Sequence, residues 1–383
     1  MILIHHENTI AIGIKNNLYL FNIELQQLQT TKIPDPVLPP NINKTRKEIL
    51  VKEQRDIISV AFSKDGELIA VCTSNKQLLL YDKKLSVLRN CVTDRLVSKV
   101  CFSHINEVIV ADRSGDVNLY KFNEKNDEPE LILGHLSILL DVAISDCGKY
   151  IVTCDRDEKI RVSYYPNSYN ILSYCLGHVE FVKNIKIVGT IVISASGDGT
   201  IRFWDIITGN ELHCIDTMEF ADEVESKAAL EKMYADVDSE HLEIYTLPIT
   251  QMEVMSNGNV VYVAINLLHC NSIQVHFAEI NSDKSISSKF LSNIDLKETI
   301  LAFSLQRNFY ILTESSFYFC TVSPTGLDVN ICKLLDVLFE EIKKTEDFCV
   351  KCNDNVIYSL YKRKYNNVEE YLERKKQRLE SKK

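Results

Sequence analysis

Tryptophan is almost absent from this sequence, whereas the other residues that build β-strands are common. One Trp stands beside 17 Tyr and 15 Phe in 383 residues, and hydrophobic residues make up 45% of the chain. Aromatic and β-branched residues fit the pleated, half-buried surface of a sheet, so this composition favours strands over helices. The length suits one large repeat domain or two ordinary ones.

The sequence also lacks segments that would place it in a membrane. No apolar run approaches the roughly 18 residues that a membrane-spanning helix needs. The chain starts with Met-Ile-Leu-Ile-His-His-Glu, which has no charged leading region and no full apolar core. We therefore expect neither a secretory signal nor any membrane contact.

Phosphate-binding and metal-binding patterns are missing as well. No Gly-x-Gly-x-x-Gly opens a helix, no Walker pattern occurs, and residues 197–199 (Gly-Asp-Gly) are too few to cradle a phosphate. The twelve cysteines are scattered, and the pair Cys349 and Cys352 has no second pair to complete about four zinc ligands. We expect no metal, no cofactor and no catalytic machinery, a plain strand at the cysteine pair, and reduced thiols in the cytosol or nucleus.

Charge is unevenly spread along the chain. The net charge of −10 argues against a dedicated nucleic-acid binder with a basic surface. Residues 216–243 carry ten acidic residues against two lysines, whereas residues 362–383 carry nine basic residues against four acidic ones. We expect an acidic insertion at 216–243 and a basic tail at 362–383. The tail could touch RNA phosphates, act as a nuclear import signal, or be a solvated helix.

A repeated unit decides the fold class. Its clearest copy begins with Gly-His at residues 177–178 and continues through two strand-like runs joined by Gly-Asp-Gly-Thr at 197–200, ending in Trp-Asp at 204–205. Asp-Gly supplies the positive φ of a tight hairpin turn. The preceding copy begins with Gly-His at 134–135 and follows the same order.

Sliding this register along the chain finds seven equivalent positions: Phe21, Tyr81, Tyr120, Ser163, Trp204, His276 and Cys320. Four of the six separations are 39–44 residues, which matches a WD blade. The other two are explained by insertions, a proline-rich loop at 30–50 and the acidic stretch at 216–243. The pattern predicts an all-β, seven-bladed WD-repeat β-propeller over residues 1–361, followed by a C-terminal helical tail at 362–383.

Ring closure and two helices complete the predicted architecture. Closing the ring removes exposed sheet edges, and we expect strands at 2–4 and 9–14 and a late strand at 356–360 to share in it. Apolar residues at helical spacing predict a helix at 333–344. A second helix at 367–383 is expected to begin at an Asn367/Glu370 capping pair.

Two sets of polar residues are candidates for a site. His178, Ser194, Asp198 and Trp204 have the order of the structural hydrogen-bonded tetrad of a WD blade. Ser, His and Asp also form hydrolase triads, but a structural set should recur with the blade period, and a catalytic one need not. The set does recur one blade earlier as His135, Thr153 and Asp157, with Ser163 replacing the Trp.

The second set is the charged turn, residues 155–161 (Asp-Arg-Asp-Glu-Lys-Ile-Arg). Six of its seven residues are charged, where neighbouring blades use small residues. Strand alternation puts Lys159 and Arg161 on one face, opposite Ile160 and Val162. A charged turn is often only a solvated turn, but a mix of signs also sets the register of a specific protein interface.

Four segments of the sequence resemble a known family: residues 134–145, 154–163, 175–182 and 196–202. They are similar to the non-catalytic WD-repeat subunit of the tRNA (guanine-N7) methyltransferase, whose insect members are called Wuho. The strong similarity covers about residues 130–205, and Ser163 in the Trp position also suits this family.

The resemblance implies a scaffold that forms a heterodimer with a catalytic methyltransferase subunit and holds it in active form. That partner would bind S-adenosylmethionine and make N7-methylguanosine in the tRNA variable loop, with tRNA reached through the complex and the nucleus as the expected location. Carried over by residue, Glu158 and Arg161 are the main expected partner contacts, flanked by Asp157 and Lys159.

Two other function classes remain as alternatives. A ubiquitin-ligase substrate receptor often has Trp-Asp-x-Arg at the end of a blade, but here Trp204 and Asp205 are followed by two isoleucines. An enzyme using the central mouth of the propeller would need carboxylates or histidines clustered on the inner strands, and the pattern contains none.

Overall fold

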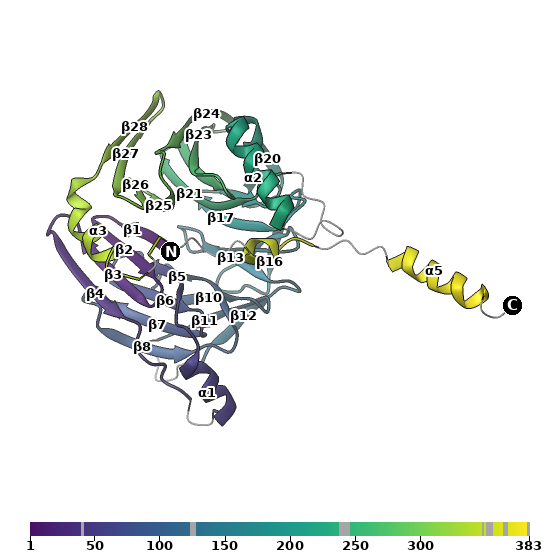
Figure 1. Cartoon of the computed structure of the whole chain (residues 1–383), viewed down its shortest axis with the longest axis horizontal. Helices are drawn as coiled ribbons and strands as arrows, with labels where there is room; N and C mark the ends of the chain where they lie inside the picture. Colours follow the sequence, from purple (N-terminus) through teal and green to yellow (C-terminus); the bar gives the residue numbers. More distant parts are fainter. Residues whose placement is uncertain are drawn as a thin grey trace.

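The computed structural model describes residues 1–39, 42–122, 128–236, 246–346, 348–349, 355–362 and 367–380. Their strands form seven four-stranded antiparallel sheets arranged as a ring (Figure 1). In each sheet the four strands follow one another along the chain, so each blade is one continuous segment. The prediction of a seven-bladed propeller is confirmed.

The first four blades cover the N-terminal half of the chain. Blade 1 contains β1 (Ile2–His6), β2 (Thr9–Ile14), β3 (Asn17–Asn22) and β4 (Gln27–Lys32), and blade 2 contains β5 (Ile57–Phe62), β6 (Leu68–Thr73), β7 (Gln77–Asp82) and β8 (Val87–Val92). Blade 3 contains β9 (Val97–Phe102), β10 (Val108–Asp112), β11 (Asp116–Tyr120) and β12 (Glu130–Gly134), and blade 4 contains β13 (Leu139–Ile144), β14 (Tyr150–Asp155), β15 (Ile160–Tyr164) and β16 (Ile171–Cys175).

Three further blades complete the ring. Blade 5 contains β17 (Val182–Val188), β18 (Ile191–Ser196), β19 (Thr200–Asp205) and β20 (Glu211–Asp216), and blade 6 contains β21 (Ile249–Asn257), β22 (Val260–Leu267), β23 (Ser272–Ile280) and β24 (Ile286–Asp295). Blade 7 contains β25 (Ile300–Leu305), β26 (Phe309–Thr313), β27 (Phe317–Ser323) and β28 (Gly326–Ile331).

Each of the seven positions found by the repeat register lies on the third strand of its blade, and all seven side chains are buried. Successive side chains point to opposite faces of a strand. Because both faces of each sheet pack on neighbouring blades, the side chain at the repeat position of the third strand is buried in every blade. The buried hydrophobic residues accordingly form seven clusters in the described part of the chain, one between each pair of adjacent blades. The core is therefore a ring of blade-to-blade contacts.

The ring closes where blade 1 meets blade 7. Strand β1 contacts β25, as each other first strand contacts the first strand of the next blade. His5 Nδ1 lies 2.8 Å from Ser304 Oγ across this junction. The predicted strands at 2–4 and 9–14 share in the closure, but the late strand at 356–360 was wrong: α4 (Asn355–Tyr358) is a short helix there. A short apolar run is ambiguous between strand and helix, and blades 1 and 7 each already have four consecutive strands without this one.

Both insertions contain helices. The expected loop at 30–50 begins with the end of β4 and ends in α1 (Lys44–Lys52), because the prolines stop at Pro40 and the following residues include neither Pro nor Gly. The acidic insertion forms η1 (Thr217–Phe220) and α2 (Glu223–Asp236), and its residues 237–243 lie outside the described part. Ala229 and Met233 of α2 are buried against blades 5 and 6.

The chain continues past the last blade as helical segments. The predicted helix at 333–344 is confirmed as η2 (Lys333–Leu335) and α3 (Asp336–Ile342), which pack on blades 1 and 7. The predicted tail helix is confirmed as α5 (Asn367–Glu380), which lies away from the ring in Figure 1; the side chains of its expected capping pair lie outside the described ones. Cys349 is half-buried in a turn, whereas Cys352 of the expected cysteine strand lies outside the description. No helix in the described ranges has the length and apolar character needed to cross a membrane.

Candidate functional site

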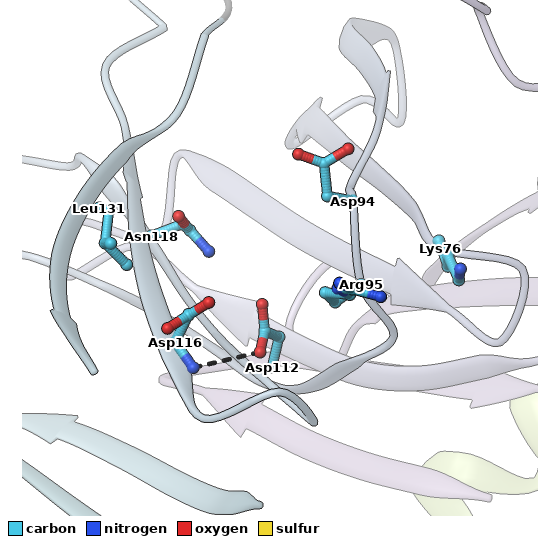
Figure 2. Close-up of a pocket in the computed structure, with 7 residues that line it drawn as sticks. All are labelled: Lys76, Asp94, Arg95, Asp112, Asp116, Asn118 and Leu131. Carbon is cyan, nitrogen blue, oxygen red and sulfur yellow. Dashed lines mark hydrogen bonds between the residues drawn. The ribbon is translucent and has the colours of Figure 1, made fainter. Parts of the chain in front are cut away.

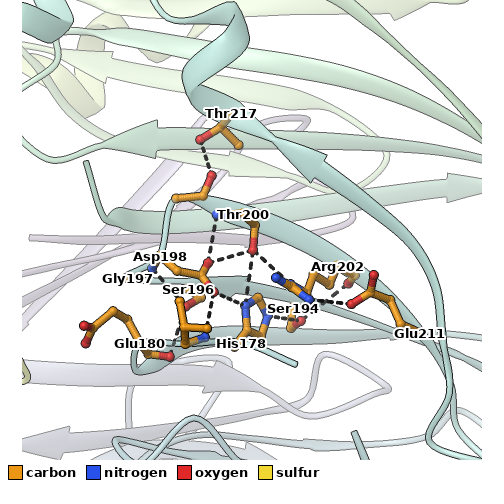
Figure 3. A network of polar contacts seen from close by, with 12 residues as sticks. His178, Glu180, Ser194, Ser196, Gly197, Asp198, Thr200, Arg202, Glu211 and Thr217 are labelled. Carbon is orange, nitrogen blue, oxygen red and sulfur yellow. Dashed lines mark hydrogen bonds and ion pairs between the residues drawn. The ribbon is translucent and has the colours of Figure 1, made fainter. Parts of the chain in front are cut away.

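The four tetrad residues of blade 5 form one chain of hydrogen bonds, and Figure 3 shows three of them, His178, Ser194 and Asp198. His178 Nδ1 lies 2.9 Å from Asp198 Oδ2, and its Nε2 lies 2.7 Å from Ser194 Oγ. Trp204 Nε1 donates to the same Ser194 oxygen over 2.8 Å. The chain joins the loop before the blade, its second strand, its turn and its third strand, so it fixes the geometry of the turn.

Burial decides between a structural and a hydrolytic role for this set. Burial raises the pKa of Asp198, but hydrogen bonds from His178 and Thr200 outweigh that effect and hold it below the usual value. Ser194 and Trp204 are fully buried and the His178 side chain has no exposed surface. A serine nucleophile must reach a substrate carbonyl, and Ser194 reaches only its neighbours, so the set is structural.

Blade 4 has a shorter version of the network. His135 Nε2 lies 2.8 Å from Thr153 Oγ1, and His135 Nδ1 lies 2.9 Å from Asp155 Oδ2. The prediction of Asp157 as the acidic member was therefore wrong, and Asp155 fills the role. Its other oxygen accepts the backbone N–H groups of Asp157 and Lys159, so the aspartate caps the turn from the end of β14 while it holds the histidine.

In blade 4, Ser163 stands where blade 5 has Trp204, and Arg161 bonds to this serine. Its Nε donates to Ser163 Oγ over 3.0 Å, and its two terminal nitrogens donate to the carbonyls of Gly134 (3.1 Å) and Ser168 (3.0 Å). The residue is only 8% exposed. The guanidinium thus braces blade 4 against the last strand of blade 3, and the structure does not place it as an open partner contact.

Asp157 and Glu158 are the half-buried acidic residues at the tip of the charged turn. Glu158 has a left-handed backbone with φ 64°, at the place where blade 5 has Gly199 with φ 74°. A residue with a Cβ pays a steric cost in that region. A glutamate at this position, in place of glycine, therefore keeps a half-buried carboxylate at the tip of the turn in spite of backbone strain.

A lysine from the end of the chain meets these two carboxylates. Lys362 Nζ lies 2.5 Å from Glu158 Oε1 and 3.6 Å from Asp157 Oδ1. Lys159 remains exposed, and its Nζ reaches only the Asp157 carbonyl at 3.4 Å. Of the four predicted contacts, the structure therefore brings Asp157 and Glu158 together as an acidic pair, keeps Lys159 outside, and buries Arg161.

One exposed apolar side chain lies in a segment that contacts the charged turn, and another lies in the equivalent loop of the next blade. The segment before β13 lies against the charged turn, because Arg156 N donates to the Ile138 carbonyl over 2.9 Å, and Leu136 in that segment is fully exposed. Val179, in the corresponding loop of blade 5, is 71% exposed. Single exposed apolar side chains are common on protein surfaces, so what distinguishes Leu136 is that its segment contacts the charged turn.

A polar pocket lies between blades 2 and 3 (Figure 2). Its volume is about 490 Å³, and its lining is Lys76, Asp94, Arg95, Asp112, Asp116, Asn118 and Leu131. Asp112 uses one oxygen to cap its own turn through the Asp116 N–H. Across the described residues, no group of three or more His, Cys, Asp or Glu is placed to hold a metal ion.

Two residues at the charged turn, Asp155 and Lys362, were not among the predicted site residues. Asp155 could have been found, because an aspartate at the end of the second strand also caps the turn of blade 3, where Asp112 binds Ser114 and Asp116. Lys362 carried no such signal, since it lies 204 residues from Glu158 in the sequence.

Comparisons with known proteins agree with this architecture. The family model described as tRNA methyltransferase TRM82 WD40 domain matches residues 118–315, and a WD domain, G-beta repeat model matches residues 47–82. The chain is 31% identical over 347 residues to the tRNA (guanine-N(7)-)-methyltransferase non-catalytic subunit wuho of Culex quinquefasciatus, covering 86% of this chain and 78% of that protein.

Other relatives match over a shorter part. The tRNA (guanine-N(7)-)-methyltransferase non-catalytic subunit WDR4 of Homo sapiens is 42% identical over 166 residues, covering 41% of this chain and 40% of that protein. The Danio rerio subunit wdr4 is 38% identical over 204 residues, covering 50% of this chain and 49% of that protein. The matches to these vertebrate relatives thus span half of their length or less.

Solved structures are similar in fold. A chain in the crystal structure of the mitotic checkpoint complex superposes with a TM-score of 0.61 at 14% identity, over 83% of this chain and 88% of that one. The C-terminal WD40 domain of Sif2 gives a TM-score of 0.55 at 18% identity, over 81% and 76%. At such identities the likeness shows the propeller alone. The TRM82 model, which covers about half of the chain, and the Culex relative together show that the chain belongs to the family of WD40 non-catalytic subunits of tRNA (guanine-N7) methyltransferases.

Proposed function

We propose that this chain is the non-catalytic scaffold subunit of a tRNA (guanine-N7) methyltransferase. It binds the catalytic subunit as a heterodimer and stabilises it for N7-methylguanosine formation in the tRNA variable loop. The observation that carries the proposal is the match to a relative named as such a subunit over 86% of this chain. The alternative of a ubiquitin-ligase substrate receptor has no support from the family.

The docking surface in this proposal is the acidic pair with its apolar neighbours. Asp157 and Glu158 present carboxylates on a turn whose backbone Asp155 caps, and Arg161 braces the strand that follows it. Leu136, in the segment that contacts this turn, and Val179, in the equivalent loop of blade 5, add exposed apolar side chains. In protein interfaces a few anchors carry most of the binding energy, whereas charges contribute to specificity and register. Arg161 supports the surface from inside the blade.

The chemistry belongs to the partner in this proposal. S-Adenosylmethionine binds the catalytic subunit, and tRNA reaches this chain only through the complex. We also propose that the protein works in the nucleus, a location that fluorescence microscopy of the tagged chain tests directly.

The test of this proposal is reconstitution. The tagged full chain is expected to co-purify with its catalytic subunit, and N7-methyl transfer to tRNA is expected only from the pair. Glu158→Lys is expected to lose association, whereas the control Glu67→Lys, which changes an exposed glutamate paired with Lys83 in blade 2, is expected to retain it. Unchanged N7-methylguanosine in tRNA after depletion of this chain from cells contradicts the proposal.

A further inference from the structure

The segment that follows the last blade crosses the same face of the ring as the charged turn. Residues 355–362, which we name the strap, begin with α4 and end at Lys362. Tyr358 Oη lies 2.6 Å from Nε2 of His269, which follows β22 in blade 6. Tyr361 Oη donates to the Gly197 carbonyl in the turn of blade 5 over 3.3 Å. The strap thus passes the turns of blades 6, 5 and 4 in order.

Two buried residues anchor the strap directly before Lys362. Leu360 and Tyr361 are each 6% exposed and belong to the cluster between blades 5 and 6. The Tyr361 ring packs edge-on against Phe181 with centroids 5.2 Å apart. An aromatic side chain buried in this way stabilises its segment strongly, so the backbone of Lys362 is delivered to the charged turn by a fixed anchor.

The contact that Lys362 makes is much weaker than the anchor. Its side chain is 41% exposed, and those of Asp157 and Glu158 are 31% and 26% exposed. Burial lowers the pKa of Lys362, but pairing with Glu158 and Asp157 outweighs this and raises it above the usual value. Ion pairs with this much solvent access contribute little free energy and exchange easily. The side chain can leave the turn without moving Tyr361.

The strap therefore places a cation on the two carboxylates that the proposed function assigns to docking. We propose that Lys362 is an internal occupant of the Asp157/Glu158 pair, holding in the free chain the place that a lysine or arginine of the partner takes in the complex. The inference rests on the proposed function, because it assumes that the acidic pair is the docking site. Lys362 thereby neutralises the two carboxylates until the partner displaces it.

Competition of this kind has a measurable consequence. An occupied site binds its partner with an apparent affinity reduced by the fraction of time the site is open. Removing the internal cation is expected to tighten partner binding roughly two- to fivefold, the range set by breaking one exposed ion pair. If Lys362 instead belonged to the interface, its removal would weaken binding, so the sign of the change separates the two cases.

The first experiment compares Kd values for the purified catalytic subunit binding to the full chain. Lys362→Gln is expected to lower Kd two- to fivefold, whereas the control Lys83→Ala, which breaks the exposed pair with Glu67, is expected to leave it unchanged. Glu158→Gln is expected to raise Kd, and adding Lys362→Gln to it is expected to recover nothing. A Kd that is unchanged or raised by Lys362→Gln overturns the inference. Failure of the wild-type chain to bind overturns the proposed function instead.

A second experiment needs no partner. Mass spectrometry after brief acylation with an amine reagent reports how available each lysine is in the free chain. Glu158→Gln is expected to increase the labelling rate of Lys362 but not of Lys83. Adding the catalytic subunit to the wild-type chain is expected to raise Lys362 labelling as well. Unchanged labelling of Lys362 in Glu158→Gln, or protection of Lys362 in the complex, contradicts internal occupancy.

Discussion

Arg161 Nε donates to Ser163 Oγ over 3.0 Å, and Ser163 stands where the next blade has Trp204, the one Trp of the sequence. In blade 5 an indole donates into the tetrad, whereas in blade 4 a guanidinium crosses to the carbonyls of Gly134 and Ser168. The loss of the Trp and the burial of the arginine are thus one arrangement. It ties the charged turn to both its own blade and the preceding one.

Arg161→Ala is expected to destabilise the fold by about 3 kcal/mol, because it removes charged hydrogen bonds and leaves buried carbonyls without their donor. The measurement is the free energy of unfolding from urea denaturation. Arg202→Ala is the control, since Arg202 lies at the matching position of blade 5 and pairs with the more exposed Glu211; a change below about 1 kcal/mol is expected there. Loss of partner binding by Arg161→Ala at unchanged stability would show instead that Arg161 is a direct contact.

Glu158→Gly is expected to separate function from stability. Glycine adopts the left-handed backbone without cost, so the free energy of unfolding should stay level or rise by up to about 1 kcal/mol. The same change removes a carboxylate from the docking pair, so association with the catalytic subunit should weaken. The two measurements are thermal unfolding of the chain and titration of the partner. A stability loss beyond about 1 kcal/mol contradicts the strain argument at this position.

Ser194→Ala is expected to cost more stability than Trp204→Phe. Ser194 Oγ joins both His178 and Trp204, so its loss leaves two buried polar groups without a partner, each worth about 1–3 kcal/mol. Trp204→Phe removes one bond and some packing volume. Urea denaturation of both variants checks the order. Equal or reversed losses would mean that packing of the indole, not the hydrogen-bonded chain, fixes this blade.

Leu136→Asp is expected to weaken partner binding at least about tenfold, as loss of an interface anchor does, while leaving the fold intact. Leu136 is fully exposed, so a charge there has no internal contact to break. Leu25→Asp is the matched control, because Leu25 is 64% exposed in blade 1, away from the charged turn. Titration of the catalytic subunit into each variant gives the comparison. Equal effects of the two substitutions would remove Leu136 from the docking surface.

Acid is expected to destabilise the protein through His276 and His5. Burial lowers the pKa of both from 6.5 to about 4, so each stays neutral when folded and gains a proton when unfolded. The stability that depends on these neutral histidines is fully present above pH 6.5 and is lost as the pH falls towards 4. The loss in free energy of unfolding amounts to about 2 kcal/mol per histidine at pH 5. His276→Phe is expected to flatten the pH dependence of stability between these values. An unchanged slope in urea titrations at pH 5 and 7 contradicts this origin.

The sequence by itself determined the number of blades and their register. Seven buried third-strand positions could be found because a WD blade repeats its order of loop, strand and turn, and each repeat obeys the same two-residue alternation. The tetrad around His178 was predictable for the same reason, since its members lie within one blade and at fixed separations. The family could be inferred from the charged turn because that motif is unusual among such blades.

Only the tertiary structure decided how the charged turn is used. Strand alternation placed Lys159 and Arg161 on one face. In the packed blade, however, the arginine is buried beside Ser163, which stands at the Trp position, and local pattern does not reveal this. The sequence likewise offered a strand at 356–360, whereas the seven blades are each complete with four strands from residues 2–331 and this segment forms the short helix α4. Lys362 meets Glu158 because the ring brings the end of the chain back over blade 4, and a contact 204 residues apart depends on that closure and on no local pattern.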